Sequence, residues 1–303
     1  MWELQQMKCI VTGGAGFIGS HIVDALIDLG HTVIVIDDES SEANAEFFHN
    51  EEAVYYCNDI VDYKATRHLY EGVSHVFHLA ANSRIQPALN NPLRCVEVNT
   101  YGTATVLQCA REAGCQRVVY SSTSSSYGLK NNIPYREDMP EDCLNPYSVA
   151  KVAGEKLCKM YSDLFKLDTI ILRYFNIYGE RQPLKGQYAP VIGLFQEQAR
   201  RGEPLTIVGT GLQRRDFTHV KDAVRANIAC LTSLPPGGSV INIGTGFNHS
   251  IREIADMISD NQVHIPERPG ECTETLADIS QAKRYLKWEP TVKLEDWINE
   301  YKL

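Results

Sequence analysis

The fold is decided by the stretch Met7-Lys8-Cys9-Ile10-Val11-Thr12-Gly13-Gly14-Ala15-Gly16-Phe17-Ile18-Gly19-Ser20-His21. Its apolar start is typical of a buried parallel strand, and apolar residues from Ile18 onward recur at helical spacing. Gly13 permits a tight turn, Gly16 lets a pyrophosphate approach the backbone, and Gly19 lets the helix pack closely on the strand. The backbone N–H groups at the start of this helix, around Phe17 and Ile18, suit a phosphate. The stretch therefore predicts a dinucleotide-binding turn rather than an ordinary one.

A second apolar run supports this interpretation, because residues 32–36 end at Asp37. A carboxylate about 20 residues after the glycines is the group expected to accept hydrogen bonds from the adenosine ribose. The same charge would repel a 2′-phosphate. We therefore expect NAD rather than NADP.

The overall composition is that of a globular protein of 303 residues with a formal net charge of −9. This charge argues against general binding to nucleic acid or to an anionic membrane. No apolar run approaches the ~20 residues of a membrane span, and residues 1–6 lack the basic and apolar regions of a signal peptide. The nine cysteines form no CxxC pair, which predicts a reduced, cytoplasmic protein without disulfides or a structural metal. His75 and His78 bracket a probable strand, and packing is the expected role for both.

Apolar and amphipathic segments alternate along the first half of the chain. Strands are expected at 53–56, 76–80 and 116–120, and helices at 62–71 and 92–113. This alternation predicts a Rossmann-type, doubly wound parallel α/β sheet. Asp59 and Ile60 follow the third strand, where Asp59 could accept a hydrogen bond from adenine or cap a helix. Leu79, Ala80 and Ala81 end the fourth strand, where a cofactor could lie close.

Two polar segments follow the fifth strand. Residues 121–128 read Ser-Ser-Thr-Ser-Ser-Ser-Tyr-Gly, either a ligand site at the carboxyl end of the sheet or a plain polar loop. Asn145 and Pro146 then begin a helix that places Tyr147 and Lys151 on one face. An ammonium favours the phenolate, and activity at neutral pH requires the tyrosine pKa to fall by about 3 from its usual value near 10. We expect Lys151 and a cationic nicotinamide ring to lower it together. A chance Tyr-x-x-x-Lys pair is the alternative.

Together these motifs resemble the extended short-chain dehydrogenases/reductases, and within them the nucleotide-sugar epimerases. The resemblance covers nearly the whole chain in order. It is carried by the glycine turn, His-Leu-Ala-Ala at 78–81, Ser-Ser-Thr at 121–123, the Tyr147–Lys151 pair, Arg-Tyr-Phe-Asn-Ile-Tyr-Gly at 173–179, Gly-Thr-Gly-Leu-Gln-Arg-Arg-Asp-Phe at 209–217 and Arg-Pro-Gly-Glu at 268–271.

The resemblance implies a role for individual residues. Thr123, Tyr147 and Lys151 would form the catalytic set, and Lys151 would also bind the nicotinamide ribose. Asn99 matches an asparagine beside the active site of the family, where a structural role is expected. The cofactor-binding residues implied in total are Gly13, Gly16, Phe17, Ile18, Gly19, Asp37, Asp59, Ile60, Leu79, Ala80, Ala81, Asn99, Tyr147, Lys151 and Tyr174.

The resemblance also implies a nucleotide-sugar site in the second half of the chain. Asn176, Arg215 and Arg268 would contact the diphosphate, and Glu271 would contact the uridine ribose. Thr275 falls where the family varies the space beside the sugar C2, and its size suits both UDP-glucose and UDP-N-acetylglucosamine. The substrate residues implied in total are Thr123, Ser124, Asn176, Gln187, Tyr188, Val191, Arg215, Arg268, Glu271 and Thr275.

Two domains and a homodimer follow from the same resemblance. Residues 7–176 with about 217–247 would bind NAD, and about 177–216 with 248–303 would bind the UDP-sugar. The dimer would form through the helices at 92–113 and 146–165. The implied reaction inverts the C4 hydroxyl of a UDP-hexose or UDP-N-acetylhexosamine through a transient 4-keto sugar, with NAD regenerated in each cycle.

Three rival functions remain. A 4,6-dehydratase or a decarboxylase would carry Asp-Glu after the catalytic threonine, whereas Ser124 and Ser125 stand there. A net oxidoreductase would use the same triad. A non-catalytic dinucleotide-binding protein usually loses the tyrosine or the lysine, and this chain keeps both.

Overall fold

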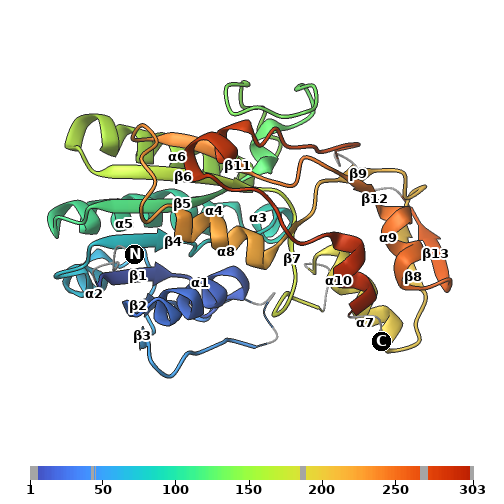
Figure 1. The fold of residues 1–303 in the computed structure, drawn as a ribbon, viewed down its shortest axis with the longest axis horizontal. Helices are drawn as coiled ribbons and strands as arrows, with labels where there is room; N and C mark the ends of the chain where they lie inside the picture. The colour runs from blue at the N-terminus through green and yellow to red at the C-terminus, as the bar shows by residue number, and fades with distance from the viewer. Residues whose placement is uncertain (1–5, 42–43, 45, 185–188, 267–271, 301–303) are drawn as a thin grey trace.

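Seven parallel strands form the central sheet of the computed structural model, which describes residues 6–41, 44, 46–184, 189–266 and 272–300. The strand order is β11-β6-β5-β4-β1-β2-β3 (Figure 1). The bounds are β1 Lys8–Thr12, β2 Thr32–Ile36, β3 Val54–Tyr56, β4 His75–His78, β5 Arg117–Thr123, β6 Asp168–Tyr174 and β11 Ser239–Ile243. The order reverses between β1 and β4, so a crevice opens at their carboxyl ends. The predicted Rossmann-type fold is confirmed.

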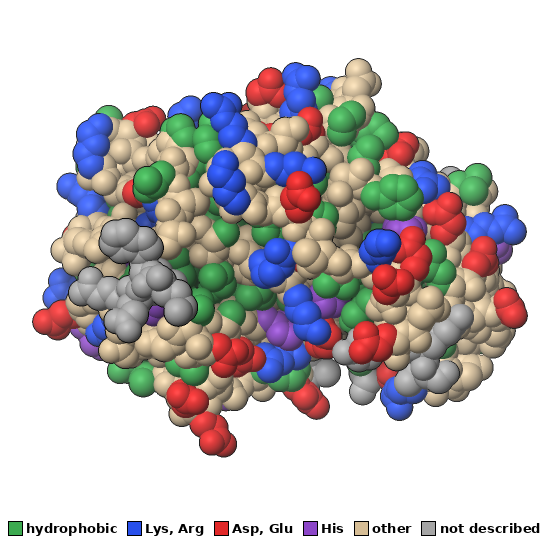
Figure 2. All heavy atoms as spheres, in the orientation of Figure 1, with side chains coloured by type: hydrophobic (Ala, Val, Ile, Leu, Met, Phe, Trp, Pro, Cys, Tyr) green, Lys and Arg blue, Asp and Glu red, His purple; other side chains and the backbone are tan. Residues whose placement is uncertain are grey.

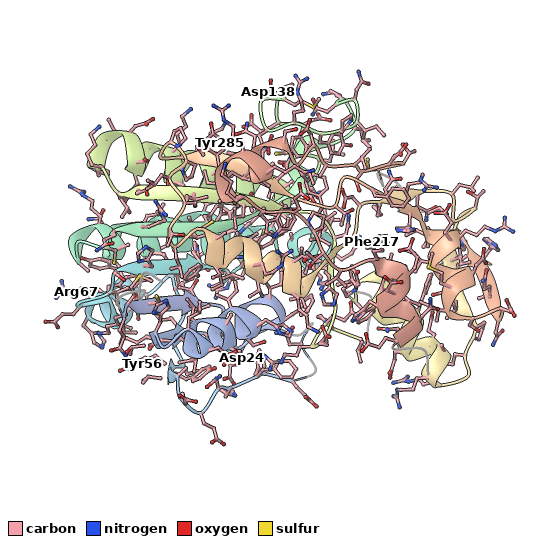
Figure 3. The ribbon with its side chains drawn as sticks, viewed as in Figure 1. Asp24, Tyr56, Arg67, Asp138, Phe217 and Tyr285 are labelled. Atoms are coloured by element: carbon pink, nitrogen blue, oxygen red, sulfur yellow. The ribbon has the colours of Figure 1, made fainter. Side chains whose placement is uncertain are left out.

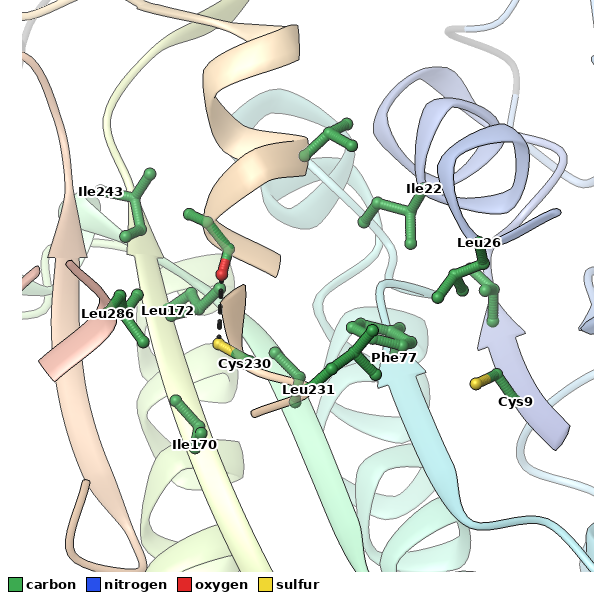
Figure 4. Packing of buried hydrophobic residues seen from close by; sticks show 14 of the residues in the cluster. Cys9, Ile22, Leu26, Phe77, Ile170, Leu172, Cys230, Leu231, Ile243 and Leu286 are labelled. Carbon is green, nitrogen blue, oxygen red and sulfur yellow. Dashed lines mark hydrogen bonds between the residues drawn. The ribbon is translucent and has the colours of Figure 1, made fainter. Parts of the chain in front are cut away.

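Helices cover both faces of this sheet because successive strand residues point to opposite faces. On one face, α1 (Phe17–Asp28), α8 (Val220–Ala229) and the π-helix η4 (Ala282–Leu286) pack on one buried cluster, part of which Figure 4 shows. On the other face, α5 (Thr103–Glu112), α6 (Pro146–Phe165) and the 3₁₀ helix η1 (Arg67–Tyr70) pack on a second cluster. The sheet is thus buried between two apolar layers.

Three predicted boundaries were wrong. The helix expected at 62–71 is a short helix, α2 (Tyr63–Thr66), followed by η1. The helix expected at 92–113 is α4 (Pro92–Val96), the π-helix η2 (Glu97–Gly102) and α5, preceded by the short helix α3 (Ile85–Asn90). Strand β5 extends to Thr123, so three of the residues expected in the polar loop belong to the sheet. The rest of that loop begins with the 3₁₀ helix η3 (Ser124–Tyr127).

A smaller C-terminal lobe lies beside the sheet and has an apolar core of its own. It contains α7 (Val191–Arg200), β8 (Leu205–Val208), α9 (Ile251–Ile258), β13 (Gln262–Ile265) and α10 (Leu294–Glu300). Phe217 lies where the lobe meets the larger body (Figure 3). Two short strand pairs lead into the lobe: β7 (Ile177–Tyr178) with β10 (Thr218–His219), and β9 (Arg214–Arg215) with β12 (His249–Ser250).

The surface carries charges of both signs, interspersed over the face shown in Figure 2 rather than gathered into one basic patch. In the part of the chain that the structure describes, no helix combines the length and the apolar character needed to cross a membrane.

His78 confirms the packing role predicted for it. Its Nδ1 lies 2.7 Å from Thr12 Oγ1 in β1, and its Nε2 lies 3.0 Å from Thr103 Oγ1 in α5. Burial, together with a smaller effect of the nearby Lys151 charge, lowers the pKa of His78 to about 3. The neutral imidazole therefore ties the sheet to a helix behind the cleft.

We expect this histidine to make the fold sensitive to acid. Between pH 6.5 and pH 3 the unfolded state binds a proton that the native imidazole does not, so stability falls as the pH drops below about 6.5. At pH 5 the loss from this group alone is about 2 kcal/mol. In urea unfolding, the free energy of unfolding of His78→Gln should fall less steeply toward acid pH than that of the parent, although the variant should be less stable at pH 7.

The exposed His49 provides the control, since it lies on the surface and pairs with Glu39. The free energy of unfolding of His49→Gln should fall with acid pH as steeply as that of the parent protein. An equally steep fall for His78→Gln and the parent would contradict the role assigned to His78.

Candidate active site

One cleft of about 1150 Å³ runs from the carboxyl edge of the sheet to the C-terminal lobe. Most of the predicted site residues line it, although they are spread over 263 positions of sequence from Gly13 to Thr275. Those residues are Gly13, Gly16, Phe17, Ile18, Gly19, Asp37, Asp59, Ile60, Leu79, Ala80, Ala81, Thr123, Ser124, Tyr147, Lys151, Tyr174, Asn176, Val191, Arg215 and Thr275. The predicted Gln187, Tyr188, Arg268 and Glu271 lie outside the described residues.

The glycine turn fits a pyrophosphate, because its three glycines differ in what a side chain would meet. A Cβ on Gly13 would lie 2.6 Å from Ala80 N, and one on Gly19 would lie 2.1 Å from Gly13 O. These two glycines are required by the fold itself. A Cβ on Gly16 would come no closer than 3.4 Å to the protein, yet Gly16 lines the cleft and begins α1 without a side-chain cap. The space above Gly16 is therefore suited to a ligand.

Two carboxylates stand at the expected ribose and adenine positions. Asp37 Oδ2 accepts a hydrogen bond from Ala15 N at 3.0 Å, and burial raises the pKa of its carboxyl. This bond fixes the carboxylate against the glycine turn, and its oxygens keep lone pairs for ribose hydroxyls. Asp59 does not cap a helix, since Asp62 caps α2. Instead, Asp59 Oδ2 lies 2.5 Å from an Arg94 guanidinium nitrogen. An adenine contact for Asp59 remains a prediction.

The proposed catalytic residues come from β5 and α6. Helix α6 begins with a capping box, in which the Asn145 side chain accepts from Ser148 N at 2.9 Å. This start places Tyr147 and Lys151 one turn apart on the cleft side. Thr123 ends β5, where its hydroxyl accepts from Ser125 N at 3.1 Å. The three residues reach the cleft at the carboxyl edge of the sheet, the same edge at which Asp37 follows β2.

The electrostatics of Tyr147 differ from the prediction. Burial raises the pKa of Tyr147, and the groups that oppose this are the Thr123 hydroxyl and the Arg84 guanidinium. The Lys151 ammonium instead lies 4.2 Å from the centre of the Tyr120 ring, and burial lowers the pKa of Lys151 to about 8. The chain alone therefore does not bring the phenol toward neutral pH, because a buried phenolate loses its hydration.

A buried ion pair that the sequence analysis missed lies beneath this group. Arg173 of β6 binds both carboxylate oxygens of Glu155, at 2.9 and 2.7 Å, and Ser122 Oγ donates to the same carboxylate at 2.5 Å. Glu155 follows Lys151 by one helical turn. The pair holds α6 against the ends of β5 and β6, and the i+4 spacing after Lys151 was the signal that could have revealed it.

The loop after β4 carries a second missed residue, Arg84, which lines the cleft. Its backbone has φ +82° and ψ 155°, a conformation that side-chain-bearing residues rarely adopt and that costs about 1–3 kcal/mol. Asn99 fixes this loop by accepting from Asn82 N at 2.8 Å and donating to Asn82 O at 3.0 Å. Asn99 is buried and is not part of the cleft lining, so its amide has the structural role that the resemblance implied rather than a cofactor contact.

The substrate residues of the second half lie on connections between the sheet and the lobe. Asn176 has φ +35°, and its Nδ2 donates to Asp216 O at 2.7 Å. Thr275 Oγ1 accepts from Asp216 N at 3.3 Å, and Arg215 lies in β9 beside it. Tyr174, on the cofactor side, is held by Ser121 and Asn227. These side chains face one cleft, but their ligand contacts remain predictions.

Comparison with known proteins agrees with this geometry. Residues 9–244 match the NAD dependent epimerase/dehydratase family. The chain is 36% identical to the UDP-glucose 4-epimerase of Mycolicibacterium smegmatis over 96% of both chains, and 32% identical to the UDP-glucuronate 4-epimerase of Thermodesulfobacterium geofontis over 95% of this chain and 93% of the relative. The crystal structure of Thermotoga maritima UDP-glucose 4-epimerase with UDP-glucose has a TM-score of 0.92 and 32% identity, covering 97% of this chain and 98% of that one.

Some other relatives are named decarboxylases or dehydratases of nucleotide sugars, so the family alone does not select one reaction. Several solved neighbours contain NAD, for which the glycine turn and Asp37 of this chain are suited. On its sequence, its fold and its cleft, the chain belongs to the NAD dependent epimerase/dehydratase family and uses NAD as its cofactor.

Proposed function

We propose that the protein inverts C4 of a UDP-hexose through a transient 4-keto sugar. The observation that carries this proposal is the meeting of Thr123, Tyr147 and Lys151 at one end of a cleft whose other end holds the glycine turn. The relatives named as UDP-sugar 4-epimerases, which match over nearly their whole length, support the same reaction.

Each residue has a defined task in this reaction. NAD, when bound, supplies reversible hydride acceptance, so that C4 can be oxidised and then reduced within one turnover. Tyr147 takes the proton of the C4 hydroxyl, directly or through Thr123, and returns it when the hydroxyl re-forms. Lys151, with a pKa near 8, keeps a positive charge at neutral pH and holds the nicotinamide ribose. The Glu155–Arg173 pair keeps both helix and strand in place.

The distribution of acidic side chains disfavours a 4,6-dehydratase. In the described lining of the cleft, the Asp and Glu residues are Asp37, Asp38 and Asp59, all of them at the ribose and adenine end. Beside Thr123 stand Ser124 and Ser125, whose hydroxyls are too weakly acidic to protonate a leaving group near neutral pH. Epimerisation requires no such acid at C6.

We propose that the lobe and the segments leading to it bind the nucleotide sugar, while the sheet-containing domain binds NAD. The domain limits are those expected from the sequence. Thr275 lines the cleft, and its moderate size suits both UDP-glucose and UDP-N-acetylglucosamine, as predicted.

A homodimer completes the proposal. Helices α4, η2 and α6 pack together and leave large apolar side chains exposed, which is unfavourable in water. The exposed residues on these elements are Leu93, Val96, Tyr101, Val149, Leu164 and Phe165. A second copy of the chain would bury them through the helices expected from the sequence.

Proton NMR of the purified protein mixed with UDP-glucose, and separately with UDP-N-acetylglucosamine, tests the proposed reaction. Without added NAD, new anomeric signals of the C4 epimer are expected, because the cofactor is regenerated in each cycle. A dehydrated or decarboxylated product would contradict the proposal. The two initial rates would rank the substrates.

Tyr147→Phe should lower kcat by about 10²- to 10⁴-fold, since it removes the proton-transfer group. KM and the NAD content of the purified protein should change little. Tyr161→Phe is the matched control: Tyr161 lies on the same helix, but its hydroxyl donates to Gln108 at 2.9 Å on the side facing α5. A Tyr147→Phe enzyme within threefold of the parent would rule out this residue as the base.

Leu93→Arg should break the dimer, because the Leu93 side chain is 83% exposed in the single chain and would be buried between copies. Size-exclusion chromatography with light scattering should show a dissociation constant raised by at least about 10-fold, equivalent to 1.4 kcal/mol. Leu234→Arg, at a residue 86% exposed outside these helices, should leave the mass unchanged. Equal masses for the two variants would contradict the interface.

A further inference from the structure

Arg84 is a cation placed beside the reacting end of the cleft. It directly precedes α3, which packs on α6 through Ala88, Ala150 and the ring of Tyr147. The guanidinium and the Tyr147 phenol are close enough for each to shift the pKa of the other. The Asn99 side chain holds the loop through two hydrogen bonds to the backbone of Asn82, two residues before Arg84.

One nitrogen of the Arg84 guanidinium, Nε, is buried and has no hydrogen-bond partner among the residues that the structure describes. None of the ion pairs found there includes Arg84. The cleft carboxylates Asp38 and Asp59 lie at the other end, where both face Arg94. Arg84 is partly buried, and a partly buried guanidinium without a counter-ion is unfavourable, so the arrangement points to an anion supplied by a ligand.

The strained backbone points the same way. Arg84 adopts φ +82° and ψ 155°, a region that glycine occupies far more readily than arginine. Nothing in the packing of the loop requires a guanidinium, because the Asn99 side chain acts on the backbone of Asn82. An unfavourable conformation held in place by its surroundings is typical of a functional residue.

The position of Arg84 indicates which group of the ligand supplies the anion. The glycine turn of β1 and α1 is suited to the cofactor pyrophosphate, and Arg215 and Asn176 on the lobe side are proposed for the UDP diphosphate. The part of the substrate that must lie beside Tyr147 is the hexose, since this tyrosine exchanges a proton with the C4 hydroxyl. The substituent on the neighbouring ring carbon, C5, is the group nearest to C4 that can carry a charge.

We propose that Arg84 binds a carboxylate on C5 of the hexose, and that the preferred substrates are therefore UDP-hexuronates. The planar guanidinium can donate two parallel hydrogen bonds to a carboxylate. A neutral sugar such as UDP-glucose offers a hydroxymethyl group there and leaves the partly buried charge of Arg84 without a counter-ion. This inference rests on the proposed C4 epimerisation and names its substrate class.

The kinetic test compares UDP-glucuronate with UDP-glucose in the parent, Arg84→Ala and Arg84→Lys. We expect the parent to favour UDP-glucuronate in kcat/KM, and Arg84→Ala to lose about 10- to 100-fold more with this substrate than with UDP-glucose, since any loss that arises through Tyr147 is common to both sugars. Arg84→Lys should recover part of the loss, because it keeps the charge without the planar fork. Arg136→Ala is the control: this arginine is exposed, pairs with Asp138 and does not line the cleft.

A binding measurement makes the result independent of turnover. In the Tyr147→Phe background with NAD bound, calorimetry should show a dissociation constant for UDP-glucuronate raised about 10- to 100-fold by Arg84→Ala, with that for UDP-glucose unchanged. NAD content and melting temperature of each variant show that it folds. Equal weakening of both sugars, or of neither, would overturn the proposal.

Two outcomes separate this inference from the proposed function. If Arg84→Ala lowers kcat/KM equally for both sugars and moves the pH profile upward, Arg84 acts only through Tyr147 and the carboxylate proposal is wrong, while epimerisation stands. If the parent converts UDP-glucuronate to a UDP-pentose and CO₂, the epimerase proposal fails. A selective loss of UDP-glucuronate binding would then still support the role of Arg84.

Discussion

The structure depends on a steric constraint: no side chain fits between the β1–α1 turn and the strands around it. A Cβ on Gly13 would touch the backbone of Ala80, one on Gly14 would lie 2.7 Å from Val35 Cγ1, and one on Gly19 would press on Gly13 O. These contacts bring α1, β1, β2 and the end of β4 together. Because of them, the crevice at the strand reversal has a bare backbone floor, on which a phosphate can lie close to the start of a helix.

The opposite wall of the cleft is organised by buried charge. A buried ion pair such as Glu155–Arg173 contributes little net stability, since its attraction is offset by the loss of hydration. Its effect here is positional: it fixes one turn of α6 against β5 and β6, and Lys151 lies one turn earlier on the same helix. The Lys151 ammonium packs on the Tyr120 ring rather than on Tyr147. A Cβ on Gly154 would lie 2.3 Å from the Tyr120 hydroxyl, so the close approach of α6 to β5 again depends on a glycine.

The sequence predicted what depends on local pattern, and missed what depends on tertiary contact. The glycine turn, Asp37 and the Tyr147–Lys151 spacing are local signals, and each led to the cleft. Arg84 gave no such signal, because an arginine after a strand is usually solvated, and only the packing of α3 on α6 places it beside the phenol. For the same reason the contact of the Lys151 ammonium with the Tyr120 ring was missed, because helical spacing does not show toward which ring the ammonium turns. The combined effect of Lys151 and a bound nicotinamide on the pKa of Tyr147 stays a prediction. The π-helical turn at Glu97–Gly102, which interrupts a helix that looks continuous, also has no clear local pattern.

The charged side chains of the cleft are distributed unevenly. Asp37, Asp38 and Asp59 lie with Arg94 where we propose that the adenosine binds, while Arg84 and Lys151 stand at the proposed reacting end. Charges inside a cleft are less screened by salt than charges on the surface, so this asymmetry acts on ligands directly. Asp37 would repel an additional phosphate on the ribose, as predicted from the sequence, and this agrees with the use of NAD. At the other end, the positive charge of Arg84 opposes the burial effect that raises the pKa of Tyr147. An anion on the sugar would partly neutralise this charge and so reduce its effect on the tyrosine. A substrate carboxylate held by Arg84 would therefore bind more tightly, but it would weaken the effect of Arg84 on the Tyr147 phenolate. The Thr123 hydroxyl would then be the remaining group of the chain that favours ionisation of Tyr147.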